Sequence, residues 1–183
     1  AFPARGPRGG DCIPFGDILP GADGQLRVAI YEVLQLRDDR VYLYRSPDGG
    51  KTWGEPTPLD AGARRNETAL AHLGGGQWLA AARISELQLY RSEDDAKNWT
   101  ACGPVTQASQ HPGDFLQLRD GRWLLTYGNR TPDRGVDVRF AHDAGKTWSP
   151  PLRVADFQGD GGYPSSIQLA DGNAIKAQLP APG

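Results

Sequence analysis

The stretch that decides the fold is Ser46–Trp53, SPDGGKTW, which brings a serine, an aspartate, two glycines, a threonine and a tryptophan into one short segment. Looser copies follow at 92–99, SEDDAKNW, and at 141–148, AHDAGKTW. Successive copies begin 46 and 49 residues apart, and blades of β-propellers repeat at about 40–50 residues. The repeat therefore predicts a series of similar structural units along the chain.

A second repeated signal, a glycine turn followed by an apolar run, accompanies the boxes. Four segments carry it, ADGQLRVAIY, GGGQWLAAAR, RDGRWLLTYG and ADGNAIKAQL, with turn glycines Gly24, Gly76, Gly121 and Gly172. Polar and apolar residues alternate in VYLYRS (41–46) and LQLYRS (87–92), and this period of two favours strands. No segment combines helical periodicity with capping residues. We therefore predict an all-β fold built from four-stranded units.

The two repeats together divide the chain into candidate blades. The predicted parts are an N-terminal extension or partial strand (1–10), three blades (11–62, 63–108 and 109–158) and the first half of a further blade (159–183). Three and a half blades do not close a propeller, and open strand edges promote aggregation. We therefore expect missing blades or a second chain to close the ring. Since the chain contains no methionine, we expect a piece of a longer protein, the alternative being removal of an initiator methionine.

Each box falls between the third and fourth strands of its unit, where it is expected to form a hairpin turn. Asp48 can accept hydrogen bonds from the turn amides, and Gly50 permits backbone angles that other residues resist. Burial of Trp53 removes about 150–250 Å² from water, which contributes at most about 4–6 kcal/mol. One carboxylate is too few for a calcium loop, so a structural staple is predicted. Its members are Ser46, Asp48, Gly50, Thr52, Trp53, Asp94, Trp99, Asp143, Gly145 and Trp148.

The composition narrows the classes of partner. A formal net charge of −2 and a pI of about 5.9 argue against nucleic-acid and anionic-membrane binding. No apolar run approaches the roughly 20 residues of a membrane helix. The three histidines, His72, His111 and His142, lie in different units, so no metal site is predicted. The two cysteines, Cys12 and Cys102, are able to pair but do not define a compartment; a secreted or periplasmic parent protein is slightly favoured.

The first box resembles the Asp-box, or BNR repeat, of sialidases, and all five of its motif positions match. Three longer segments resemble sialidase segments in the right order: RNETALAHLGGGQWLAAAR (65–83), LLTYGNRTPDRGVDVR (124–139) and GGYPSSIQLADGN (161–173). The resemblance covers about residues 13–178 and is closest to bacterial sialidase-like glycosidases with BNR repeats. It implies a six-bladed propeller, of which this chain would hold blades three to five and the first half of blade six.

The resemblance also implies roles for individual residues. Tyr163 corresponds to the catalytic nucleophile and Glu67 to the base that activates it, since a free phenol is a poor nucleophile at neutral pH. Arg83 and Arg130 correspond to arginines that grip the sugar carboxylate, with Arg134 competing for the second position. Pro164 departs from the family, in which many members have serine after the tyrosine.

The strand order places these residues independently of any relative. In an antiparallel pair, the start of one strand and the end of the next lie at the same end of the sheet. Glu67, Arg83, Arg130 and Tyr163 are therefore all expected on one face of the propeller, with the boxes on the other. The sequence offers no firm general acid, although Asp17 and Asp114 lie on plausible loops.

Two rival functions remain open beside a retaining sialidase acting on sialylated or other acidic glycans. One is a non-catalytic Asp-box propeller that binds glycans or proteins, and the other is a glycosidase with the same scaffold and a neutral substrate. The family's acid/base aspartate and first arginine are expected outside this chain. We therefore expect little or no turnover of ordinary sialosides by the chain alone.

Overall fold

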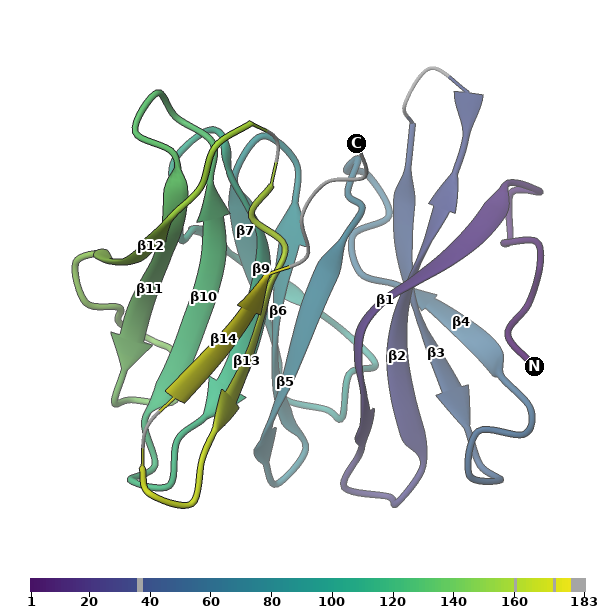
Figure 1. Ribbon diagram of the computed structural model, residues 1–183. Coiled ribbons are helices and arrows are strands. Elements are labelled where there is room, and N and C mark those ends of the chain that lie inside the picture. Colours follow the sequence, from purple (N-terminus) through teal and green to yellow (C-terminus); the bar gives the residue numbers. More distant parts are fainter. Residues whose placement is uncertain (36–37, 160, 173, 179–183) are drawn as a thin grey trace. The chain divides into compact units, whose positions relative to one another are not determined.

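The computed structural model describes residues 1–35, 38–159, 161–172 and 174–178 (Figure 1). Within these ranges every named element is a β-strand. The first sheet contains β1 (Asp11–Pro20), β2 (Leu26–Val33), β3 (Arg40–Ser46) and β4 (Gly54–Pro58). The second contains β5 (Thr68–Gly74), β6 (Gln77–Arg83), β7 (Leu87–Ser92) and β8 (Thr100–Pro104).

The remaining strands repeat this arrangement. The third sheet contains β9 (Gln110–Gln117), β10 (Trp123–Asn129), β11 (Gly135–Ala141) and β12 (Leu152–Asp156), and the fourth contains β13 (Pro164–Gln168) and β14 (Ala174–Gln178). In each sheet the strands follow one another in chain order. The predicted all-β fold of four-stranded propeller blades is confirmed. The blade boundaries stay predictions, and Asp160, Asn173 and residues 179–183 of the expected half-blade lie outside the described residues.

The chain forms two compact units. Unit 1 comprises residues 1–84 and 88–103, and unit 2 comprises residues 85–87 and 104–183. Unit 1 therefore holds the first two sheets, apart from Leu87 of β7 and Pro104 of β8, and unit 2 holds the other two.

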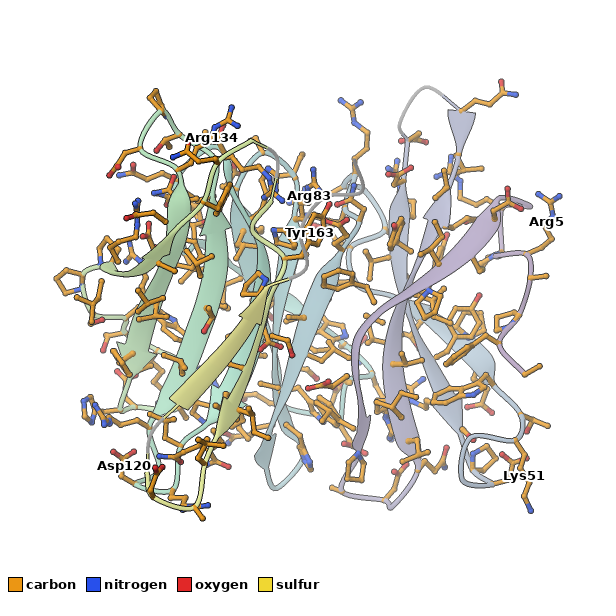
Figure 2. All side chains as sticks on the ribbon, in the orientation of Figure 1. Arg5, Lys51, Arg83, Asp120, Arg134 and Tyr163 are labelled. Carbon is orange, nitrogen blue, oxygen red and sulfur yellow. The ribbon has the colours of Figure 1, made fainter. Side chains whose placement is uncertain are left out.

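The first box, Ser46–Trp53, closes the turn between β3 and β4, where Lys51 is labelled in Figure 2. Asp48 Oδ1 accepts a hydrogen bond from the Thr52 amide at 2.9 Å, and Asp48 Oδ2 accepts one from the Thr52 hydroxyl at 2.7 Å. The Ser46 hydroxyl donates to Asp48 at 2.8 Å and accepts from the Gly50 amide at 2.8 Å. Trp53 folds back and donates from Nε1 to the Gly50 carbonyl at 3.1 Å. These bonds hold the turn closed.

The other two boxes form the same turn with substitutions. Asp94 accepts from the amide and side chain of Asn98, at 2.9 and 2.6 Å, so asparagine replaces the threonine. Asp143 accepts from the amide of Thr147 at 2.9 Å, and Trp148 donates to the Gly145 carbonyl at 3.2 Å. Each turn also needs two consecutive residues with positive φ, which are Gly49 and Gly50, Asp95 and Ala96, and Ala144 and Gly145.

Asp95 occupies a left-handed position, with φ of 61°, and its side chain joins the two sheets of unit 1. Its carboxylate accepts from Arg27 Nη2 of β2 at 2.7 Å, from Trp78 Nε1 of β6 at 2.9 Å and from the Ala22 amide at 3.2 Å. Arg27 is fully buried and also contacts Asp23 at 2.9 Å. Asp95, which stands where the first box has Gly49, thus forms a buried ion pair between the two sheets.

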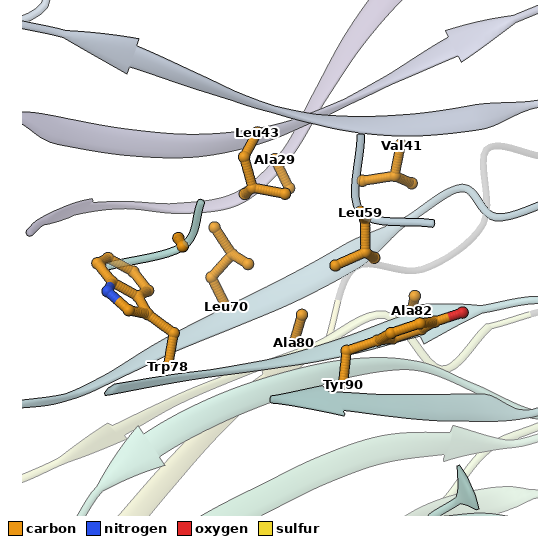
Figure 3. Packing of buried hydrophobic residues seen from close by; sticks show 10 residues of the cluster. Ala29, Val41, Leu43, Leu59, Leu70, Trp78, Ala80, Ala82 and Tyr90 are labelled. Atoms are coloured by element: carbon orange, nitrogen blue, oxygen red, sulfur yellow. The ribbon is translucent and has the colours of Figure 1, made fainter. Parts of the chain in front are cut away.

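The core of unit 1 lies between these two sheets. Ala29, Val41 and Leu43 of the first sheet face Leu70, Trp78 and other residues of the second (Figure 3). The alanines of β6 have no exposed surface, and their small side chains permit the two sheets to approach closely. Val41 and Leu43 of β3 and Tyr90 of β7, the two strands whose sequences alternate, all belong to this core.

The N-terminal extension packs on the other face of the first sheet. Phe2 packs against Trp53 with ring centroids 5.0 Å apart and ring planes tilted by 34°. The amides of Arg8 and Gly10 both donate to Glu32 Oε1 at 2.8 Å, and Glu32 is fully buried. The extension forms one isolated bridge to β1 and no strand of its own. Both cysteines of the chain are free thiols.

In unit 2, β13 packs against the third sheet at two points. Asp114 of β9 accepts from the Ser166 amide at 2.7 Å, and the Ser166 hydroxyl bonds the Thr126 hydroxyl of β10 at 2.9 Å. A Cβ added to Gly128 would lie 2.8 Å from the Gly162 Cα. Glycine at both positions therefore lets the segment before β13 lie directly on the end of β10.

The Asp48 staple predicts a loss of stability in acid. Hydrogen bonds from the backbone amide and hydroxyl of Thr52 lower the pKa of Asp48 from its ordinary 3.8 to about 2. A carboxylate with a depressed folded-state pKa stabilises the fold above its ordinary pKa, and this contribution is lost as pH falls toward 2. We expect Asp48→Asn to reduce the pH dependence of the urea unfolding midpoint between pH 4 and pH 2. Asp17→Asn, at an exposed position, is the control; equal slopes for both variants would contradict the prediction.

Candidate functional site

Glu67 and Arg83 lie side by side in unit 1. Glu67 immediately precedes β5 and Arg83 ends β6, and the register that pairs Thr68 with Ala82 brings them together. The Arg83 amide donates to the Glu67 carbonyl at 3.2 Å. Arg83 Nη1 forms an ion pair with Glu67 Oε2, and the two side chains are 26% and 13% exposed. The structure therefore joins the predicted base to one predicted arginine.

Arg130 and Tyr163 lie together in unit 2. Arg130 immediately follows β10 and Tyr163 immediately precedes β13. The Arg130 guanidinium lies over the Tyr163 ring, with Cζ 5.1 Å from the ring centroid, a geometry that favours cation–π attraction. Arg130 Nη1 also contacts Nδ1 of His111 at 3.2 Å. The tyrosine is 38% exposed, so its ring is open to solvent while one side is covered by the guanidinium.

Arg134, the competitor for the second arginine position, lies elsewhere in the same loop. Its Nη1 donates to the Gly159 carbonyl. With Asp133, Phe157 and other residues it lines an open pocket of about 370 Å³. Of the two candidates, the structure thus brings Arg130 to the tyrosine and places Arg134 in this pocket.

A buried ion network supports the loop that carries both arginines. Asp137 of β11 is 5% exposed; it accepts from Asn129 Nδ2 at 2.7 Å and from Arg153 Nε at 2.5 Å. Arg153 Nη2 donates to the carbonyl of Asp133 at 2.8 Å. The hydrogen bond to Asp137 raises the pKa of Arg153. The sequence carried no local signal for this network, because its members come from three strands and a loop.

Each unit separates its boxes from its candidate residues. In unit 1 the second box bonds the β5–β6 turn, from the Asp95 amide to the Gly76 carbonyl at 2.8 Å. That turn is at the opposite end of the sheet from Arg83. In unit 2, Asp120 of the β9–β10 turn and Tyr163 likewise lie at opposite ends (Figure 2). Each unit thus has a box end and a site end, and each pair of candidate residues lies at the site end of its own unit.

The structure also places the other residues that were considered for catalysis or metal binding. Asp114, one of two loop aspartates considered for the acid, lies within β9 and bonds β13. Among the described residues, no group of three histidine, cysteine, aspartate or glutamate side chains is placed to hold a metal ion. The same ranges contain no helix with the length and apolarity needed to cross a membrane. His111 of β9 contacts the candidate residue Arg130 through Nδ1.

Comparison with solved structures identifies this arrangement of sheets. A protein of unknown function from Dyadobacter fermentans superposes with a TM-score of 0.77 at 24% identity, over 92% of this chain and 49% of that one. Penicillium chrysogenum alpha-L-arabinanase superposes with a TM-score of 0.68 at 19% identity, over 89% and 55%. Trypanosoma rangeli sialidase superposes with a TM-score of 0.71 at 17% identity, over 97% and 31%. The chain thus spans about half or less of the length of these proteins, and they establish its fold.

Sequence comparison gives the family. No curated protein sequence matches the chain as a relative. The BNR repeat-like domain matches residues 16–175, a range that includes all three boxes and both residue pairs, as the resemblance to Asp-box proteins predicted. The chain therefore belongs to the family of BNR repeat-like domains.

Proposed function

We propose that the chain supplies part of the active site of a retaining exoglycosidase of sialidase type, which releases terminal sialic acid or a related acidic sugar. The observation that carries this proposal is the pairing at the site ends: a glutamate with an arginine, and an arginine with a tyrosine. The solved structures with this fold include a sialidase in complex with sialic acid, which supports the same substrate class.

Tyr163 acts as the nucleophile in this proposal and Glu67 as its base. A neutral phenol is not repelled by a substrate that carries a carboxylate beside the reacting carbon, which is why sialidases use tyrosine. A phenol with an ordinary pKa of about 10 needs a base to accept its proton during attack. The exposed position of Tyr163 leaves its ring accessible to a sugar.

Arg130 and Arg83 bind the sugar carboxylate in this proposal. Guanidinium groups form paired, charge-assisted hydrogen bonds with carboxylates. Arg130 is held by His111 and Tyr163, so its guanidinium is already oriented before a ligand arrives. Because the guanidinium is already ordered, binding the ligand costs less side-chain entropy.

A neutral-substrate glycosidase is the second candidate, and one contact favours it. Arg83 is already paired with Glu67, so its charge is partly compensated before a substrate carboxylate enters. An alpha-L-arabinanase, named for a neutral sugar, has the same fold. The two candidates differ in whether the ligand's charge contributes to binding.

Ligand charge therefore provides the test. We expect the chain to bind N-acetylneuraminic acid at least about tenfold more tightly than its carboxamide, because a charge-assisted hydrogen bond is roughly twice as strong as a neutral one. NMR titration of the labelled chain measures both affinities. Arg130→Ala should abolish the preference, whereas Arg122→Ala, at the box end beside Asp120, should leave it unchanged. Equal affinity for acid and amide favours the neutral-substrate enzyme, and binding of neither contradicts the proposal.

A further inference from the structure

His111 is held against Arg130 by the backbone around it. It lies in β9, where Gln110 pairs with Asn129 at the end of β10. The Arg130 amide donates to the Ser109 carbonyl at 2.8 Å, and the Ser109 amide donates to the Ser85 carbonyl at 2.6 Å. Ser109 has φ of 67°, a left-handed conformation that a serine adopts at a cost. These backbone hydrogen bonds therefore fix the conformation of the segment that leads into His111.

The contact between the two side chains defines the state of the histidine. His111 Nδ1 lies 3.2 Å from Arg130 Nη1, and His111 is 8% exposed. A guanidinium has N–H donors and no acceptor, and it stays charged. Nδ1 must therefore accept the hydrogen bond, which requires a neutral ring with its proton on Nε2. A buried histidine in this tautomer offers one directed lone pair to the arginine.

We infer that His111 is a positioning residue for Arg130, holding the guanidinium over the Tyr163 ring in the orientation that receives the ligand carboxylate. This inference rests on the proposed function for its ligand. The hydrogen bond to Nδ1 fixes one side of the guanidinium, and the Tyr163 ring, 5.1 Å from Cζ, fixes its plane. Positioning of this kind lowers the ordering required when a ligand binds.

Two variants separate positioning from simple core filling. His111→Phe keeps a ring of similar size and removes the acceptor. His111→Asn removes ring volume but keeps an acceptor at the place of Nδ1. If His111 only fills space, Arg130 should keep its orientation in His111→Phe and lose it in His111→Asn. If His111 positions Arg130, the guanidinium should keep its orientation in His111→Asn and lose it in His111→Phe.

The first measurement uses NMR on the labelled full chain without ligand. We expect long-range proton–nitrogen correlations to show His111 protonated on Nε2 at pH 7.5. The Arg130 Nε–H group should be rigid on the nanosecond timescale in the native chain and in His111→Asn, and mobile in His111→Phe. A proton on Nδ1, or an Arg130 signal equally rigid in His111→Phe, would overturn the inference whatever the chain binds.

The second measurement is the affinity for N-acetylneuraminic acid. We expect His111→Phe to weaken binding about tenfold, the effect of losing a hydrogen bond to a charged group, and His111→Asn to retain affinity within about threefold. In an Arg130→Ala background, His111→Phe should cause no further loss. If the native chain does not bind the sugar, the proposed function fails while the dynamics of Arg130 still decide the positioning role. Equal weakening by both histidine variants at unchanged thermal stability would overturn it.

Discussion

Replacement of Asp95 by alanine is expected to lower the free energy of unfolding by about 3–5 kcal/mol, because removing one partner of a buried ion pair leaves the other charge uncompensated. Arg27 has no exposed side-chain surface and would retain only Asp23, whose side chain is 39% exposed. The buried indole N–H of Trp78 would also lose its acceptor. Burial opposes ionisation of Asp95, but the Trp78 and Ala22 hydrogen bonds and the charge of Arg27 together lower its pKa.

Two further variants in the same turn separate the effect of losing the ion pair on stability from the effect of backbone strain. Asp95→Gly removes the same carboxylate but suits the positive φ of the position, so it should be about 1 kcal/mol more stable than Asp95→Ala. Glu93→Ala, at an exposed site, should change stability by no more than about 0.5 kcal/mol. Urea unfolding followed by tryptophan fluorescence measures all three. A loss below about 1 kcal/mol for Asp95→Ala would show that Arg27 finds compensation elsewhere.

The strands could be predicted from the sequence because their signals are local. The segments QWLAAAR and LQLYRS were assigned as strands, and the structure gives β6 and β7 the same bounds. The box turns were predictable for the same reason, since their hydrogen bonds join residues a few positions apart. The resemblance to sialidases selected Glu67, Arg83, Arg130 and Tyr163, and the prediction from strand order that all four lie on one face of the propeller stays a prediction.

Side-chain contacts between residues far apart in the chain could not be predicted from the sequence. Asp95 stands at a variable position of the box, where the first copy has Gly49, yet it bonds Arg27, which lies 68 positions earlier in the chain. His111 carries no local signal for its contact with Arg130, which lies 19 positions later and follows β10. Nothing in the local pattern separates Arg130 from Arg134, because the difference depends on which side chain reaches Tyr163. Contacts between sheets and across strands decide the site, and a single sequence does not record them.

The second large expected effect is covalent labelling of the nucleophile Tyr163. It requires a substrate whose leaving group departs without protonation by a general acid. In a 3-fluorosialyl fluoride, the anomeric fluoride at C2 leaves without being protonated, so the absence of an assigned general acid does not prevent the first step. Tyr163 Oη would attack the anomeric carbon while Glu67 accepts the phenolic proton. The fluorine at C3 disfavours the positive charge of the second transition state, so the sugar–enzyme intermediate accumulates.

Peptide mapping by mass spectrometry after incubation with this reagent tests the central claim most directly. The account predicts one added fluorosialyl group on the peptide containing Tyr163, complete loss of labelling in Tyr163→Phe and at least about a tenfold slower reaction in Glu67→Gln, in line with the usual contribution of a general base. Labelling of an aspartate or glutamate, or no labelling of the folded native chain, would contradict it.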